Sequence, residues 1–318
     1  MKYFLHYRFV MFVLLALLSS SLQAQPTAVA VDLRPRFMAG QQARYSLWTR
    51  RDTQTQVTVM ENVHQQDGGY VVEGEATWQV LFVNPDGSAQ CQMTFDWFSL
   101  TFDLPDGTQQ FNDTRTGANQ SLGVYEVISA MVDHPVEFTM TADGSVTAVS
   151  GTQAMRSAAG VDVELPSDLD FIESASDLAT LPFAPAKASV NQSWDSNFRW
   201  SHELGHMNYA VESTLTSVGK VHGIDLATII SMGAITLDVD HEKLPKDENL
   251  QLDVTLEEGS YQQQVFMDMD RHEVVGRNSV LRTVILTIMN SDEYSVSQVV
   301  RETVRSQALR ISETDGMP

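Results

Sequence analysis

The sequence predicts an all-β protein, built mainly of antiparallel sheets with one or two short helices. Apolar and polar side chains alternate with a period of two along most of the 318 residues, as they do in half-buried strands. Tight-turn sequences interrupt this alternation, among them Asn-Pro-Asp-Gly at 84–87 and Leu-Pro-Asp-Gly at 104–107. Turns of this kind join neighbouring antiparallel strands, so we expect a meander.

The N-terminal half, residues 25–150, contains the clearest hairpin. Its turn is Asp143-Gly144, and apolar alternation continues on both sides of it over 136–149. Between 120 and 134 the apolar residues are instead spaced for one short amphipathic helix, which ends before Pro135. The other strands expected in this half are 45–50, 57–60, 70–83 and 90–102.

Residues 151–189 differ in composition from what surrounds them. They are rich in Ala and Ser and contain three prolines, so we interpret them as a linker with a short helix over 167–180. The C-terminal half, residues 190–318, returns to strand patterns, although the last segment also fits a helix face. The expected strands are 197–204, 206–217, 220–234, 250–256, 261–269, 273–288 and 294–311.

The start of the chain has the pattern of a secretory signal peptide. Lys2 and Arg8 precede an apolar run over 9–18, and small polar residues lead to Ala24. About ten apolar residues are too few to cross a bilayer, and no later stretch reaches the length required. We therefore expect residues 1–24 to be removed near Ala24, leaving a periplasmic or secreted protein with no membrane span.

The composition restricts the class of partner. The chain has 20 basic and 41 acidic residues and a formal charge of −21. Such a surface repels phosphate backbones, which argues against nucleic-acid binding. Cys91 is the only cysteine, so no disulfide can form within the chain. Stability must come from buried apolar side chains.

One motif points to catalysis. Residues 202–206 read His-Glu-Leu-Gly-His, the pattern on which zinc metallopeptidases place their ligands. On a helix, His202 and His206 would project from one face and bind one Zn²⁺, while Glu203 would act as the general base. If the chain is a zinc enzyme, His202 and His206 are its metal ligands and Glu203 is its catalytic residue.

The residues around this motif predict a strand and a turn instead. Phe198 and Trp200 lie two apart before it, and Met207 and Tyr209 lie two apart after it. Successive side chains of a strand face opposite sides, which would separate Glu203 from a neighbouring ligand. We therefore predict no cofactor and favour a noncatalytic protein, with zinc as the alternative.

Other site patterns are weaker. Two acidic runs, 238–242 and 268–273, offer oxygen ligands for Ca²⁺, but acidic residues are also ordinary at strand ends. The sequence has no nucleophile elbow, phosphate-binding glycine loop or dinucleotide fingerprint. The five tryptophans are expected to fill sheet faces, with a sugar-stacking platform as the alternative.

The two halves resemble each other in the order of their signals. In each half an aromatic residue, a glycine and a Phe-led turn follow in sequence, which predicts two similar halves. These residues are Tyr45, Gly74 and Phe138 in one half and Trp194, Gly223 and Phe266 in the other.

This order over residues 36–311 resembles a group of uncharacterised bacterial secreted or envelope β-sheet domains of unknown function. It is more distantly similar to the lipoprotein-carrier half-barrels, in which a short helical element covers the concave face of a curved antiparallel sheet. The resemblance implies a noncatalytic binding or structural protein of the cell envelope, with an unknown ligand or envelope partner. A hydrophobic-ligand carrier and a zinc-dependent metallopeptidase are the alternatives.

Overall fold

The structure is a computed structural model that describes residues 30–120, 122–132, 134–159, 184–202, 204–242, 244, 251–291 and 294–311. The predicted signal peptide and the helix predicted over 167–180 lie outside these residues. From Val31 onward the chain forms one compact unit. No helix among the described residues has the length and apolarity needed to span a bilayer.

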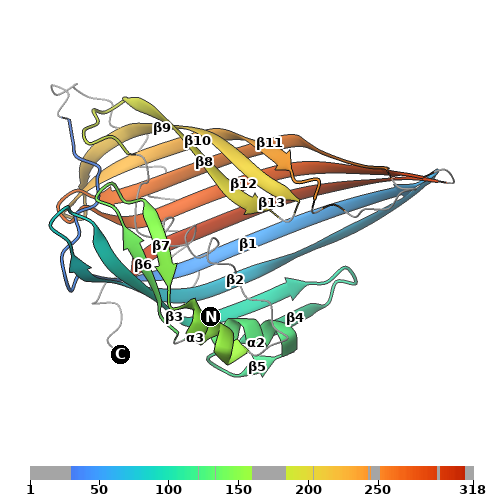
Figure 1. Cartoon of the computed structure of the whole chain (residues 1–318), viewed down its shortest axis with the longest axis horizontal. Helices are drawn as coiled ribbons and strands as arrows, with labels where there is room; N and C mark the ends of the chain where they lie inside the picture. The colour runs from blue at the N-terminus through green and yellow to red at the C-terminus, as the bar shows by residue number, and fades with distance from the viewer. Residues whose placement is uncertain are drawn as a thin grey trace. The chain divides into compact units, whose positions relative to one another are not determined.

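The described strands form a single 13-stranded sheet in which all neighbours are antiparallel (Figure 1). The predicted all-β class is therefore confirmed. In spatial order its main path is β5 (Ala118–Asn119), β4 (Gln109–Asp113), β3 (Ala89–Asp103), β2 (Asn62–Val83), β1 (Gln42–Val59), β13 (Ser295–Ile311), β12 (Glu273–Asn290), β11 (Gln251–Asp268), β10 (Ile224–Val239), β9 (Gly205–Val221) and β8 (Ser193–His202).

The first and last long strands of the sheet lie side by side. β1 pairs with β13 from Arg44 opposite Ile311 to Val59 opposite Val296. Strands from 25–150 and from 190–318 therefore belong to one sheet. The duplication of the two halves stays a prediction.

Residues 120–159 contain two helices and one hairpin. The helix predicted between 120 and 134 is confirmed as α2 (Leu122–Met131). The hairpin predicted over 136–149 is confirmed as β6 (Val136–Met140) and β7 (Val146–Ser150), which joins the sheet through β3. A second helix, α3 (Thr152–Ala159), lies at the start of the predicted linker, where no helix was expected.

The predicted start of the strand over 220–234 is wrong. β9 continues to Val221, and the chain turns at His222 and Gly223 before β10 begins at Ile224. Both turn residues have positive φ, 50° and 87°. This is the conformation of a two-residue hairpin turn, and glycine adopts it without a steric penalty.

The strands predicted over 250–256 and 261–269 are one strand, β11. Its register against β12 shifts between Leu256 and Glu258, so an extra residue is accommodated there. Such a β-bulge breaks the alternation without ending the strand. The helical alternative for the last segment is wrong, because β13 pairs with β1 and β12 along its length.

The two faces of the sheet differ in chemistry. On β1, buried Ala43 and Tyr45 alternate with exposed Arg44 and Ser46, and the strand register defines which residues of the neighbouring strands share each face. We call the face that carries Tyr45 the inner face and the opposite one the outer face.

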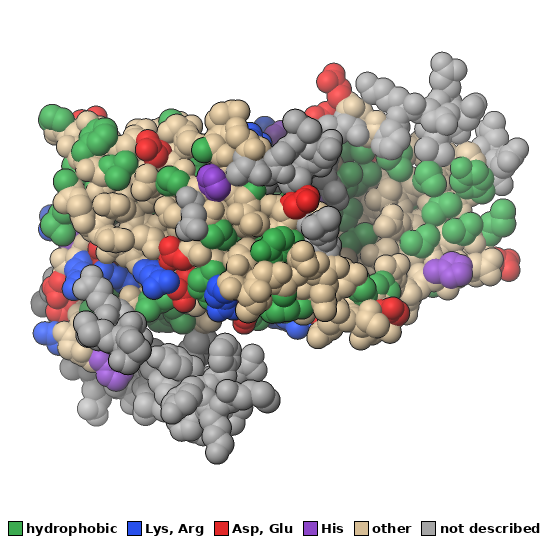
Figure 2. Space-filling model, turned by 90° about the horizontal axis from the view of Figure 1, so that it is seen from below, with side chains coloured by type: hydrophobic (Ala, Val, Ile, Leu, Met, Phe, Trp, Pro, Cys, Tyr) green, Lys and Arg blue, Asp and Glu red, His purple; other side chains and the backbone are tan. Residues whose placement is uncertain are grey.

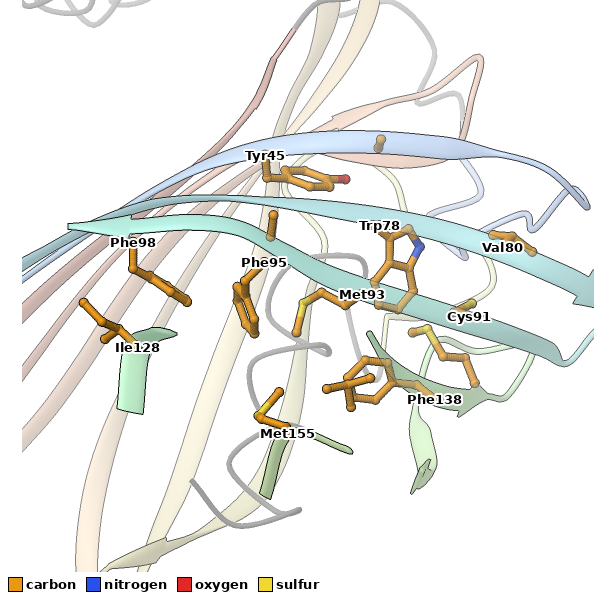
Figure 3. Packing of buried hydrophobic residues seen from close by; sticks show 14 of the residues in the cluster. Tyr45, Trp78, Val80, Cys91, Met93, Phe95, Phe98, Ile128, Phe138 and Met155 are labelled. Carbon is orange, nitrogen blue, oxygen red and sulfur yellow. The ribbon is translucent and has the colours of Figure 1, made fainter. Parts of the chain in front are cut away.

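Part of the inner face is covered by the remaining elements. α2, α3 and the β6–β7 hairpin pack against β1, β2 and β3 around a buried cluster (Figure 3). Phe138 of β6 stacks on Trp78 at a ring distance of 5.9 Å. Elsewhere, Leu33 and Ala188 pack on the inner face of β9 to β12. The aliphatic positions farther along β11, β12 and β13 belong to neither of these clusters.

Candidate binding face

The His-Glu-Leu-Gly-His motif is the turn of a β-hairpin. β8 ends at His202 and β9 begins at Gly205, as the flanking alternation predicted. His202 is opposite Gly205, and Ser201 is opposite His206, so the two imidazoles lie on opposite faces of the sheet. His202 accepts a hydrogen bond at Nδ1 from the backbone N–H of Leu204, at 3.2 Å. Glu203 lies outside the described residues.

The glycine of this motif has a backbone role. Gly205 has a φ of 148°, and a Cβ at this position would overlap the carbonyl oxygen of Asp238 and lie 2.7 Å from the nitrogen of Asp240. The adjacent bond from the Asp240 N–H to the Leu204 carbonyl, at 2.9 Å, holds the turn against the end of β10. The motif therefore contains the glycine that this close strand approach requires.

The acidic runs serve turns and ion pairs. Asp268 Oδ1 accepts the backbone N–H groups of Asp270 and Arg271 at 2.9 and 3.0 Å, which closes the turn after β11. Asp238 pairs with Arg199 at 2.7 Å. Among the residues that the structure describes, no three His, Cys, Asp or Glu side chains are grouped to hold a metal ion.

Four aromatic rings meet on the inner face near the β8 edge. Phe198 stacks on Tyr209 with ring centroids 4.7 Å apart, and Tyr209 meets Tyr261 edge-on at 5.7 Å. Trp200 completes the group, 4.6 Å from Tyr209. Tyr209 and Tyr261 belong to β9 and β11 and meet across β10, where Ile235 is opposite Tyr209 and Gly233 is opposite Tyr261.

Aliphatic side chains continue this surface along β11 and onto β12 and β13. Leu256 of β11 is opposite Ile285 of β12, which is opposite Val300 of β13. Four residues farther along each strand, Leu252 is opposite Met289, which is opposite Val296. We call this surface the distal apolar face. Its members are Phe198, Trp200, Met207, Tyr209, Val211, Ile235, Leu237, Leu252, Val254, Leu256, Tyr261, Leu281, Ile285, Met289, Val296 and Val300.

Six members of the distal apolar face form a buried cluster, namely Met207, Tyr209, Val211, Ile235, Tyr261 and Ile285, and its other members are half-buried. Leu252, Val254 and Leu256 are half-buried, whereas Asp253 and Thr255 between them are exposed on the outer face. Figure 2 shows hydrophobic side chains grouped toward the end of the molecule where Figure 1 places the β1–β2 hairpin. A contiguous apolar surface of this kind marks a site of interaction more often than a scattered exposed leucine does.

A row of small polar side chains borders this face. The row crosses the sheet at one level, and its members pair in register from β1 to β9. Thr49 donates a hydrogen bond to Ser306 at 3.1 Å, and Ser213 bonds to Ser231 at 2.8 Å. The members are Thr49, Ser306, Ser279, Gln263, Ser231 and Ser213. The row separates the distal apolar face from the covered part of the inner face.

One ion pair also lies on the inner face. Arg51 of β1 pairs with Glu302 of β13, and its guanidinium lies 5.9 Å from the centre of the Tyr70 ring. Burial disfavours the charged guanidinium, but Glu302 and the Tyr70 hydroxyl outweigh that effect and raise the pKa of Arg51 above its usual value. Arg51 is therefore held as a fixed, charged hydrogen-bond donor.

Beside Arg51 the inner face is hollowed into an open groove of about 340 Å³. The groove lies where β3 turns away from β2, since Gly69 opposite Asp103 is the last pair of these strands. Its lining includes Arg51, Thr53, Thr55, Gln66, Gly68, Tyr70 and Phe102. Sequence reasoning missed this groove, although the Gly68-Gly69 pair was a visible signal of a surface without side chains.

The fold and this face define a protein with a curved antiparallel sheet and an apolar inner surface. Residues 86–170 match a family of unknown function, DUF6263, and over that stretch the chain is similar to it. The resemblance to a family of unknown function is thus confirmed. No curated protein matches the chain in sequence.

Solved structures with a detectable likeness include the following three. A structure titled "Lipid-protein interactions in lipovitellin" shares 11% identity and a TM-score of 0.38 over 87% of this chain, which spans only 25% of that one. A DUF1329 family protein from Desulfovibrio piger shares 6% identity over 80% of this chain and 83% of that one, with a TM-score of 0.14. Pseudomonas aeruginosa OccK7 (OpdD) shares 7% identity over 86% and 100%, with a TM-score of 0.23. All three TM-scores lie below 0.5.

Proposed function

We propose that the protein is an exported, noncatalytic binding protein that holds an apolar ligand, of the kind of a lipid acyl chain, on its distal apolar face. The observation that carries this proposal is the register of half-buried aliphatic residues across β11, β12 and β13. If these residues served only to form the core, a second layer of the protein would bury them fully.

The size of the face suits such a ligand. Leu281 and Met289 on β12 are eight residues apart, which is about 26 Å along a strand. One leaflet of a bilayer core is roughly 15 Å thick, so an extended acyl chain fits within this length. Burial of apolar surface stabilises by about 25 cal/mol per Å², and a ligand on the half-buried leucines gains this contribution.

Export and acidity are consistent with this role. The predicted leader over 1–24 directs the chain out of the cytoplasm. The formal charge of −21 keeps the protein away from anionic surfaces and in solution. An apolar ligand needs no charged partner, so the net charge of the protein does not oppose its binding.

The test is extraction of the purified mature protein with organic solvent, followed by mass spectrometry. We expect a stoichiometric amphiphile or lipid in the wild type and a loss of at least tenfold in Leu256→Asp, because a buried carboxylate on this face opposes the ligand. Thr255→Asp is the matched control, since it adds the same charge to the next residue on the outer face. No ligand in the wild type, even after incubation with fatty acid, contradicts the proposal.

A further inference from the structure

The open groove beside Arg51 has two kinds of wall. Tyr70 and Phe102 meet edge-on at 6.0 Å and form an aromatic corner on the inner face. Gly68 lies two residues before Tyr70 on the same face of β2 and has no side chain to fill the space next to this corner. The result is a surface onto which a flat, partly apolar ring can be placed.

Neutral hydrogen-bonding groups surround this corner. The side chains of Thr53, Thr55 and Gln66 line the groove. Within the described part of the chain these three side chains have no hydrogen-bond partner in the protein. Hydroxyl and amide groups both donate and accept, which suits a ligand that bears several hydroxyl groups.

The charges of the groove are already balanced. Arg51 is paired with Glu302, and Asp103 accepts a hydrogen bond from Gln109 at 2.6 Å and lies 3.5 Å from Arg50. An anionic ligand would have to compete with Glu302 for the guanidinium in a protein of charge −21. The arrangement therefore favours an uncharged polar ligand.

We infer that this groove binds an uncharged, hydroxyl-rich group such as a sugar ring. The ring packs on Tyr70 and Phe102, and its hydroxyls bond to Gln66, Thr53 and Thr55. The free donors of Arg51 point to the same ligand, because one guanidinium has five N–H groups and an ion pair uses only some of them.

The groove and the distal apolar face are continuous. Thr55 is opposite Val300 on β13, which is opposite Ile285 on β12, and Leu256 follows on β11. Three strand spacings separate Thr55 from Leu256, or about 14 Å. A sugar in the groove is therefore either a free saccharide or the head of a glycolipid whose chain lies on the distal apolar face. The second source rests on the proposed function, whereas the first does not.

The experiment is isothermal titration calorimetry of the mature protein with two probes, methyl β-glucoside and octyl β-glucoside below its micelle concentration. We expect both to bind. Gln66→Ala should weaken both by about fivefold, as expected for a lost neutral hydrogen bond. Gln65→Ala is the matched control, because it removes the same side chain from the adjacent exposed position on the outer face.

A second variant distinguishes the two sources. If octyl glucoside binds more tightly and Leu256→Asp removes that advantage while binding of methyl glucoside is unchanged, the ligand is a glycolipid head. If both probes bind equally and Leu256→Asp affects neither, the groove binds a free saccharide and the lipid proposal fails alone. The inference is overturned if neither probe binds, or if Gln65→Ala and Gln66→Ala weaken binding equally.

Discussion

The hydroxyl of Tyr45 on β1 donates a hydrogen bond to the carbonyl oxygen of Val274 on β12, at 2.9 Å. β13 lies between these two strands, so the side chain reaches over it. Tyr45 is buried, and burial is the main reason that the pKa of its hydroxyl lies well above the usual value. The bond ties the first long strand of the sheet to a strand 229 residues later.

We expect Tyr45→Phe to lower the free energy of unfolding by about 1–3 kcal/mol, because the Val274 carbonyl would lose its partner in a buried place. Urea unfolding of the mature protein measures the change. Tyr294→Phe is the control, since Tyr294 is 41% exposed. Equal effects of the two substitutions would show that the bond contributes nothing.

Gly233→Ala should disturb the packing of β10 against β9 on the distal apolar face, directly across the strand from Tyr261. A Cβ at this position would lie 2.6 Å from the carbonyl oxygen of Ala210 and 2.7 Å from a methyl group of Val211. We expect a loss of about 1–3 kcal/mol in unfolding free energy, as for overpacked cores. Gly219→Ala is the matched control in β9, because nothing lies within 4 Å of its Cβ. A near-ultraviolet circular dichroism spectrum of Gly233→Ala identical to that of the wild type would contradict this account.

The purified mature protein should contain much less than one zinc ion per chain. His202 and His206 lie on opposite faces of the hairpin, so one tetrahedral ion cannot take both as ligands. Atomic absorption of the wild type and of His202→Ala measures the metal content, which we expect to be equal and well below one ion per chain. Stoichiometric zinc that disappears in His202→Ala would restore the metallopeptidase alternative.

Cys91 should be protected in the folded protein. Burial raises the pKa of its thiol to about 12, so the reactive thiolate is scarce at pH 8. We expect iodoacetamide to modify Cys91 at least 100-fold more slowly in the native protein than in urea. Equally fast modification in both conditions would contradict the burial of Cys91.

The same shift gives stability a pH dependence. In the unfolded chain the thiol ionises near its ordinary value of 9.0, whereas in the folded protein it stays protonated to about pH 12. The contribution of Cys91 is therefore full below pH 9 and is lost as the pH rises from 9 toward 12. The urea midpoint of unfolding should therefore fall farther between pH 8 and pH 10.5 in the wild type than in Cys91→Ala.

Local chemistry made much of the fold predictable. The Asp143-Gly144 turn and the α2 helix before Pro135 follow from residue preferences within a few positions. The strand character of 198–209 follows from alternation, which correctly placed the His-Glu-Leu-Gly-His motif in a hairpin. The turn at His222 was missed because the alternation on both sides hides the boundary, which the pairing of Val221 with Ile224 shows.

The candidate site was less accessible to such reasoning. Alternation identifies Leu252, Val254 and Leu256 as members of one strand face, but it does not say which residues of β12 lie beside them. That relation depends on register, and the bulge after Leu256 shifts the register by one residue. The groove beside Arg51 depends on where β3 leaves β2, which no local pattern encodes.

The pairing of β1 with β13 has a consequence for how the chain folds. Arg44 and Ile311 meet only after nearly the whole chain has been closed into a loop, which costs conformational entropy before any contact compensates for it. A topology with such distant contacts folds slowly, and a polypeptide whose last strand has not yet been synthesised leaves both β1 and β12 with unpaired edges. The protein therefore completes its fold only when its final seventeen-residue strand is available, which makes removal of that strand far more damaging than removal of any surface loop.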